Sequence, residues 1–148
     1  MTELSTKINK MFKDGVKVET LFMKLAEQNG YECFKSSKWI DINEHWDVLL
    51  KKDGKKAKVE VKGNKDAHKY GYTWIELKNV VGEIGWLYGE ADVLAFERED
   101  RFDIYCVKNI KTLVEERVDF TKPILTMKPL LEDGTVDYQY MMYRQYNR

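Results

Sequence analysis

The sequence predicts an α/β domain of the α+β kind, in which a central mixed β-sheet is flanked by helices. A helical periodicity near the N-terminus is followed by short apolar runs that alternate with polar residues, as in half-buried strands. A second helical pattern follows a further pair of such runs. Helices combined with mostly hairpin-linked strands are typical of a layered domain built on one sheet.

The first predicted element is a helix over 16–29. Its apolar side chains recur at the spacing of one helical face, and Asn29-Gly30 is a C-terminal stop signal. A strand over 31–35 and a second over 45–50 come next, separated by loops at Ser36-Ser37 and 41–44. The Asp53-Gly54 pair then predicts a tight hairpin that returns as a strand over 57–61.

The remaining elements are predicted from shorter patterns. A polar loop over 63–72 precedes an extended segment over 73–77 and a glycine-punctuated segment over 82–89. Two strands over 91–96 and 102–107 are joined by a charged turn, and a helix over 109–118 presents Ile110, Leu113 and Val114 on one face.

Length and composition restrict the class of protein. With 148 residues, the chain is predicted to form one domain over 1–148, with a flexible N-terminus over 1–14 and a C-terminal extension or hairpin over 119–148. Lysine plus arginine and aspartate plus glutamate both number 25, which argues against a globally basic nucleic-acid coat protein. Cys33 and Cys106 belong to no CxxC pair and are expected in the core. No leader or membrane span is expected, so the predicted location is the cytoplasm.

Two acidic residues and a lysine are predicted to meet on the sheet. Asp47 lies on the strand before the hairpin, and Glu60 and Lys62 share one face of the returning strand because side chains alternate. The hairpin makes the strands neighbours, so the two carboxylates approach each other and require a cation. Oxygen ligands suit Mg²⁺ or Mn²⁺, and a lysine beside the metal orients water or offsets phosphate charge.

This pattern resembles the PD-(D/E)xK nuclease superfamily, in which an acidic residue on one strand precedes E-x-K on the next. Asp47 is followed after twelve residues by Glu60-Val61-Lys62, although Trp46 stands where that family has proline. The segment from Gly15 to Phe22 looks like the first helix of Holliday-junction resolvase-like members. The resemblance implies a restriction-endonuclease-like core, a site glutamate at Glu19, a metal held by Asp47, Glu60 and the Val61 carbonyl, and a serine-bearing loop at Ser36.

A second E-x-K, Glu76-Leu77-Lys78, leaves an alternative open for the position of the site. Any single E-x-K can also be a pair of charged residues that face water on a strand and have no role in catalysis. Residues 51–69 are rich in lysine, which suits the phosphate backbone of DNA. The predicted DNA-binding residues are Ser36, Lys65, Lys69, Lys78, Trp86 and Tyr88, the last two by stacking on bases.

The function expected from the resemblance is a metal-dependent DNA endonuclease that hydrolyses phosphodiester bonds, with branched DNA such as a Holliday junction as one candidate substrate. A resolvase would act as a homodimer because two symmetric strands are cut. A restriction or repair nuclease is a further candidate, and a small neutral nuclease also fits a phage, which would place it in the host cytosol. The alternative is a non-catalytic module of the same fold that binds nucleic acid or protein.

Overall fold

The computed structural model describes residues 2–14, 16–63, 75, 77 and 85–117. In chain order, the elements are α1 (Glu3–Lys13), α2 (Val18–Gln28), β1 (Glu32–Lys35), α3 (Lys38–Glu44), β2 (Val48–Lys52), β3 (Lys55–Lys62), the 3₁₀ helix η1 (Trp86–Tyr88), β4 (Val93–Glu97), β5 (Phe102–Cys106) and α5 (Val107–Arg117).

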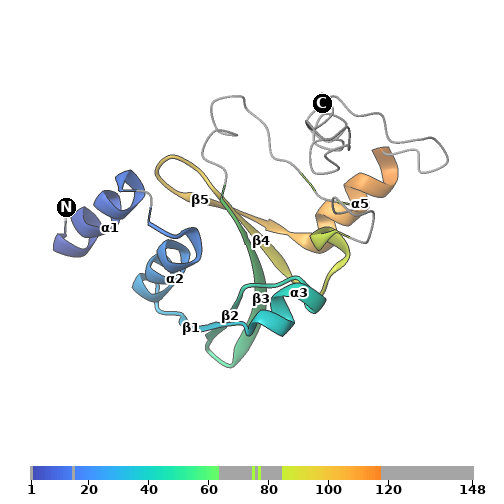
Figure 1. The fold of residues 1–148 in the computed structure, drawn as a ribbon, viewed down its shortest axis with the longest axis horizontal. Helices are drawn as coiled ribbons and strands as arrows, with labels where there is room; N and C mark the ends of the chain where they lie inside the picture. Colours follow the sequence, from blue (N-terminus) through green and yellow to red (C-terminus); the bar gives the residue numbers. More distant parts are fainter. Residues whose placement is uncertain (1, 15, 64–74, 76, 78–84, 118–148) are drawn as a thin grey trace.

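The strands form one mixed sheet in the order β1-β2-β3-β4-β5 (Figure 1). β3 and β4 run parallel, whereas β1–β2, β2–β3 and β4–β5 are antiparallel pairs. Helices flank this sheet, so the predicted α+β class with a central mixed sheet is confirmed.

The β2–β3 hairpin forms where the Asp-Gly pair predicts it. Asp53 and Gly54 have φ angles of 51° and 76°, so both lie in the left-handed region that a two-residue type I′ turn requires. The turn sets the register in which Lys52 lies opposite Lys55 and Lys51 lies opposite Lys56. The register then fixes which side chains of β2 and β3 share a face.

The N-terminal segment over 1–14, expected to be flexible, contains the helix α1. The Thr2 side chain caps α1 by accepting a hydrogen bond from the Ser5 N–H. Ile8 and Phe12, four residues apart on one helical face, are buried with Leu21 of α2. Two apolar side chains suffice to dock this largely polar helix because α2 supplies the partner surface.

α3 covers the whole stretch over 41–44, which was expected to be a loop. The Ser37 hydroxyl accepts a hydrogen bond from the Ile40 N–H at the start of the helix, and His45 ends it in a left-handed conformation with φ of 58°. The side-chain cap makes this short helix possible although it has no apolar periodicity over several turns.

The two faces of the sheet bury different sets of side chains. One face, here called the α2 face, packs Val48, Val59, Val61 and Ala95 against Phe22. The opposite α5 face carries Leu94 and Phe96 and is covered by side chains from η1, α5 and the segment before β2: Trp46, Trp86, Leu87, Val107, Ile110 and Val114. Figure 1 shows α1 and α2 on one side of the sheet and α5 on the other.

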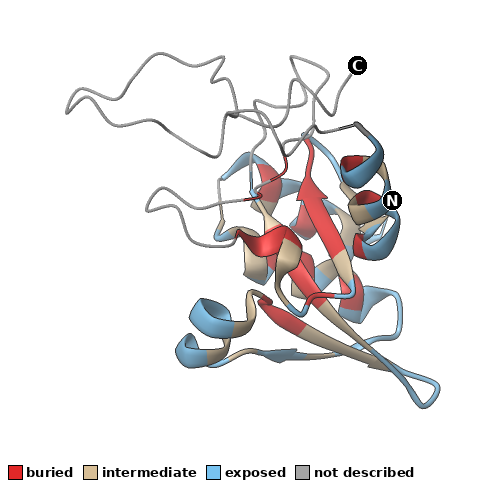
Figure 2. Ribbon diagram, turned by 90° about the vertical axis from the view of Figure 1, so that its right-hand side faces the viewer, coloured by how far each residue is buried: buried red, intermediate tan, exposed pale blue. Residues whose placement is uncertain are grey.

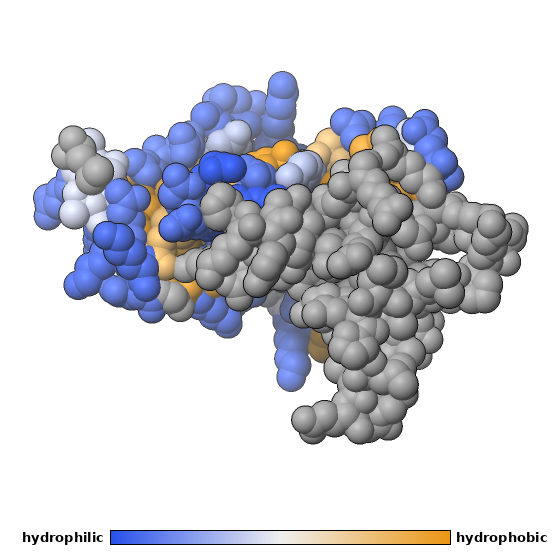
Figure 3. Space-filling model, turned by 90° about the horizontal axis from the view of Figure 1, so that it is seen from above, coloured by the Kyte–Doolittle hydropathy of each residue, from blue (hydrophilic) through white to orange (hydrophobic). Residues whose placement is uncertain are grey.

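The surface outside these layers is mostly polar. Exposed residues gather at the tip of the β2–β3 hairpin and on α3 (Figure 2). From above, apolar side chains appear as narrow bands within a hydrophilic surface in the described part of the molecule (Figure 3). Cys106 is exposed, which contradicts its expected place in the core, because it ends β5 at the edge of the sheet.

Several expected elements lie outside the described residues: the loop over 64–72, most of the segment over 73–77, and the C-terminal extension over 119–148. The extent of the single predicted domain therefore stays a prediction. None of the helices in the described ranges has the length and apolar character needed to cross a membrane.

Candidate metal centre

Three carboxylate side chains from different elements converge at one end of β2 and β3. Asp41 comes from α3, Asp47 directly precedes β2, and Glu60 lies in β3. Each offers an oxygen atom, and these three atoms lie within 4.8 Å of one another. Asp47 is 7% exposed and Glu60 is 4% exposed, whereas Asp41 reaches the group from the surface. The cluster therefore has a buried base and one solvent-facing side.

Backbone hydrogen bonds fix the position of Asp47. Its carbonyl accepts from the Ser36 N–H at 2.8 Å, and its own N–H donates to the Val59 carbonyl at 2.8 Å. Val59 lies opposite Val48 in the register, so this bond is offset by one residue, as in a β-bulge. Such an offset re-aims a side chain at the end of a ladder. Asp47 is therefore held at the entrance to β2 instead of within the strand, where the sequence placed it.

The Asp47 carboxylate is oriented by β3. Its Oδ2 atom accepts a hydrogen bond of 2.7 Å from the Val61 N–H. The N–H and C=O of one residue in a strand lie on the same edge, so the Val61 carbonyl belongs to the edge of β3 that faces Asp47. The structure thus keeps the predicted Val61 oxygen on the side of the carboxylate cluster.

Burial and like charge raise the pKa of Asp47 to about 8. The largest cause is removal of the carboxyl group from water, followed by the negative charge of Glu60, with Asp41 acting in the same direction. The hydrogen bond from Val61 opposes these effects. A proton or a cation at this position therefore relieves the repulsion between the carboxylates.

Lys62 lies beside the cluster, as the alternation in β3 predicts. Its Nζ atom is 2.9 Å from Oε1 of Glu60 and 5.3 Å from the centroid of the Trp86 ring. Val59 and Val61 belong to the α2 face, so Glu60 and Lys62 belong to the α5 face. The predicted shared face of Glu60 and Lys62 is confirmed.

The donor set fits a hard divalent cation. Asp41, Asp47 and Glu60 contribute carboxylate oxygens, which are preferred ligands of Mg²⁺ and Mn²⁺. Mg²⁺ usually retains several water molecules, and the exposed side at Asp41 leaves room for them. The raised pKa of Asp47 is the electrostatic condition that such a cation would reverse.

Asp41 is the site residue that the sequence did not reveal. It is the third carboxylate of the cluster, a role for which Glu19 was expected. Glu19 is in the first turn of α2, the helix that packs on the α2 face of the sheet. Among the described carboxylates, the group within 4.8 Å includes Asp41 and not Glu19. The capping residue Ser37 marks the start of the helix that carries Asp41, but it does not single out Asp41 as a site residue.

The structure places the predicted DNA-binding residues in different environments. Trp86 is 5% exposed and packs in the core of the α5 face, so its predicted role in stacking on a base is wrong for this conformation. Tyr88 is partly buried, and the Lys111 ammonium lies 5.8 Å from its ring centroid. Ser36 contributes its backbone N–H to Asp47. Lys65, Lys69, Glu76 and Lys78 lie outside the described residues.

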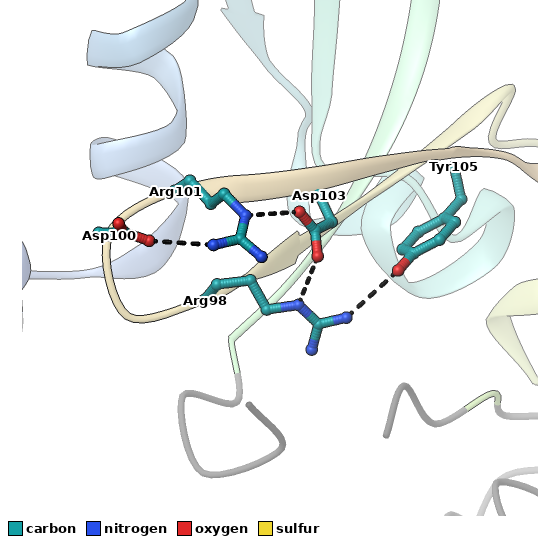
Figure 4. Close-up of polar contacts among 5 residues, drawn as sticks. All are labelled: Arg98, Asp100, Arg101, Asp103 and Tyr105. Carbon is teal, nitrogen blue, oxygen red and sulfur yellow. Dashed lines mark hydrogen bonds and ion pairs between the residues drawn. The ribbon is translucent and has the colours of Figure 1, made fainter. Parts of the chain in front are cut away.

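A buried arginine is a second feature that the sequence did not reveal. Arg98 follows β4 where a charged turn was expected, and its side chain is 7% exposed. It donates to Oδ2 of Asp103 at 2.8 Å and to the Tyr105 hydroxyl at 3.3 Å (Figure 4). Burial alone would raise the pKa of Asp103, but hydrogen bonds from Arg98 and Arg101 outweigh it and lower that pKa. This network fixes the β4–β5 hairpin near the C-terminal end of β4.

Comparison of the chain with family models, curated proteins and solved structures gives no match. The geometry of the carboxylates and of Lys62 is therefore the basis for assigning a function.

Proposed function

We propose that the chain is a divalent-metal-dependent DNA endonuclease. The observation that carries the proposal is the convergence of Asp41, Asp47 and Glu60 beside the Lys62 ammonium. The order of these groups, an acidic residue before a strand and E-x-K on the next, resembles the PD-(D/E)xK nucleases. Phosphodiester hydrolysis requires charge neutralisation at the phosphate and an oriented water, and this constellation has groups for both tasks.

Asp47 and Glu60 would hold the cation, together with the Val61 carbonyl. The cation, when bound, neutralises charge on the phosphate and lowers the pKa of a water. The Val61 N–H keeps the Asp47 carboxylate in one orientation, and Asp41 adds a carboxylate at the solvent-facing side of the cluster.

The Lys62 ammonium provides a positive charge for the scissile phosphate. It lies 2.9 Å from Glu60 in the free protein, so its aliphatic stem is already directed to the site. In the proposed reaction, the water oxygen attacks phosphorus, the bond to the leaving oxygen breaks, and the water proton passes to that oxygen through solvent. Lys62 would stabilise the added negative charge during this displacement.

Cleavage of a panel of linear, nicked, flap and four-way DNA in Mg²⁺ or Mn²⁺ tests the proposal and identifies the substrate. Asp47→Asn and Glu60→Gln should each lower cleavage at least about a hundredfold, because each removes a charge from the cluster. Asp53→Asn is the matched control: Asp53 is exposed in the hairpin turn, and its φ of 51° suits asparagine.

Two results would contradict the proposal. If Asp47→Asn cleaves DNA at the wild-type rate, this cluster is not the catalytic site. Binding of DNA and metal without cleavage of any substrate would instead support the alternative of a non-catalytic module. Resolution of a four-way junction would also require a homodimer, which light scattering on the junction complex measures.

A further inference from the structure

Large apolar side chains are exposed next to the carboxylate cluster. Trp39 is 65% exposed and Ile42 is 58% exposed on α3, and Phe34 on β1 is 45% exposed. α3 begins three residues after the end of β1, so these side chains belong to adjoining parts of the surface. Exposed aromatic residues that gather beside a candidate active site indicate a binding surface.

The orientation of α3 explains why Trp39 faces solvent. Ile40 packs against the core of the α5 face, and the Asp41 carboxylate reaches the cluster. Successive residues of a helix are rotated by about 100°, so Trp39 and Ile42 share the outward side of α3. The same short helix thus presents one carboxylate to the cluster and an indole to solvent.

Lysines lie on the same face of the hairpin as Phe34. Phe34 is opposite Leu49 in the register, and Leu49 packs against the core of the α5 face. Lys51, two residues after Leu49, shares that face and lies with its Nζ atom 4.8 Å from the Phe34 ring centroid. Lys56 lies opposite Lys51. Along β3, the side chains at 56, 58, 60 and 62 continue this face from the hairpin to the cluster.

We propose that Phe34, Trp39, Lys51 and Lys56 form a surface that binds an unpaired strand of DNA. The bases stack on the two aromatic rings, and the lysines contact the phosphates that lead to the carboxylate cluster. The exposed rings favour a single strand over a duplex, because the faces of the bases are hidden in a duplex. The row of lysines favours a nucleic acid over a protein partner, because the phosphates of a nucleic acid are negatively charged. The inference rests on the proposed function for the location of the scissile bond.

The hairpin offers a matched pair of variants for the test. Lys51→Ala/Lys56→Ala removes the cross-strand pair on the α5 face, and Lys52→Ala/Lys55→Ala removes the neighbouring cross-strand pair on the opposite face. Both doubles remove the same charge from the same hairpin. Binding is measured by fluorescence anisotropy with the full chain, in chelator so that no cleavage occurs, on labelled oligo(dT) and on a blunt duplex at several salt concentrations.

The Lys51/Lys56 double should reduce the dependence of log K on log salt by about 1.4 for the single strand, since each phosphate contact contributes about 0.7. The Lys52/Lys55 double should leave the slope unchanged. Equal losses in both doubles would overturn the proposal, because net charge alone would then explain binding.

Trp39→Ala should weaken binding of the single strand about tenfold and binding of the duplex much less, whereas Trp39→Phe should retain most of the affinity. Circular dichroism and thermal melting establish that the variants are folded, which their exposed positions favour. An equal loss for both ligands in Trp39→Ala would overturn the stacking role.

The two proposals fail in different ways. If wild type cleaves DNA and Trp39→Ala binds oligo(dT) normally, only the strand-binding surface is wrong. If oligo(dT) binding depends on Trp39 and Lys51 but no DNA is cleaved, the strand-binding surface is supported and the nuclease function is wrong.

Discussion

Asp47→Asn should stabilise the metal-free protein near pH 8. The side chain that it replaces is buried beside Glu60, and its pKa is raised to about 8 from an ordinary value of 3.8. Asparagine is similar in shape, and its carbonyl oxygen can still accept the hydrogen bond from the Val61 N–H. The substitution therefore removes the charge while it keeps the main structural contact.

The sign and size of the effect follow from proton linkage. A carboxyl group with a raised pKa in the folded state binds protons more tightly than in the unfolded state, so folding is favoured at low pH and loses this advantage between pH 3.8 and about 8. At 1.36 kcal/mol for each pKa unit, the loss by pH 7 is on the order of 4 kcal/mol. Asp47→Asn should lack this pH dependence.

Urea unfolding followed by tryptophan fluorescence from pH 5 to about pH 8 measures the free energy of unfolding of each variant. Asp53→Asn, the exposed control, should follow the wild-type curve. Mg²⁺ should raise the stability of the wild type at pH 8 through its preference for the folded state, and it should have little effect on Asp47→Asn. Parallel curves for wild type and Asp47→Asn without metal would refute the electrostatic reasoning.

Four further substitutions have expected outcomes. Lys62→Met should lower cleavage about a hundredfold while calorimetry still detects metal binding, because an ammonium cannot be a metal ligand; loss of both would contradict its role. Gly89→Ala should lower the free energy of unfolding in urea by about 1–3 kcal/mol, because an added Cβ would lie 2.5 Å from the His45 Cβ atom. Arg98→Met should cost about 1.5–3 kcal/mol in the same assay, since the Arg98 side chain is 7% exposed and its hydrogen bond to Asp103 joins two charged groups. Arg101→Met, at an exposed position of the same network, should cost less than about 1 kcal/mol.

The parts of the site that could be predicted from the sequence are those set by local rules. The Asp-Gly turn specifies a two-residue hairpin, and the alternation of strand side chains then places Glu60 and Lys62 together. Asp47 is close to Glu60 for the same reason. These relations depend on short segments whose geometry has few solutions, so a single sequence is sufficient to derive them.

The parts that could not be predicted depend on contacts between distant segments. Gly85 and Gly89 next to Trp86 suggested an exposed ring, but Gly89 allows close approach to His45 and the Glu44 carbonyl, and Trp86 packs in the core. Asp41 had no recognisable pattern because its place in the cluster follows from where α3 meets the start of β2. Tertiary packing, and not residue type, decides these positions.

α3 is the element through which the two proposed activities are related. It has seven residues, so Trp39, which faces solvent, and Asp41, whose carboxylate belongs to the cluster, are held at a fixed separation on one short helix. The capping bond from Ile40 to Ser37 and the bond from the Ser36 N–H to the Asp47 carbonyl tie this helix to the strand entrance that carries Asp47. A base stacked on Trp39 would therefore fix the position of its strand relative to the carboxylate cluster. Selection of an unpaired strand and hydrolysis of its backbone would then depend on one short helix, because moving α3 would displace the stacking ring and a cluster carboxylate together.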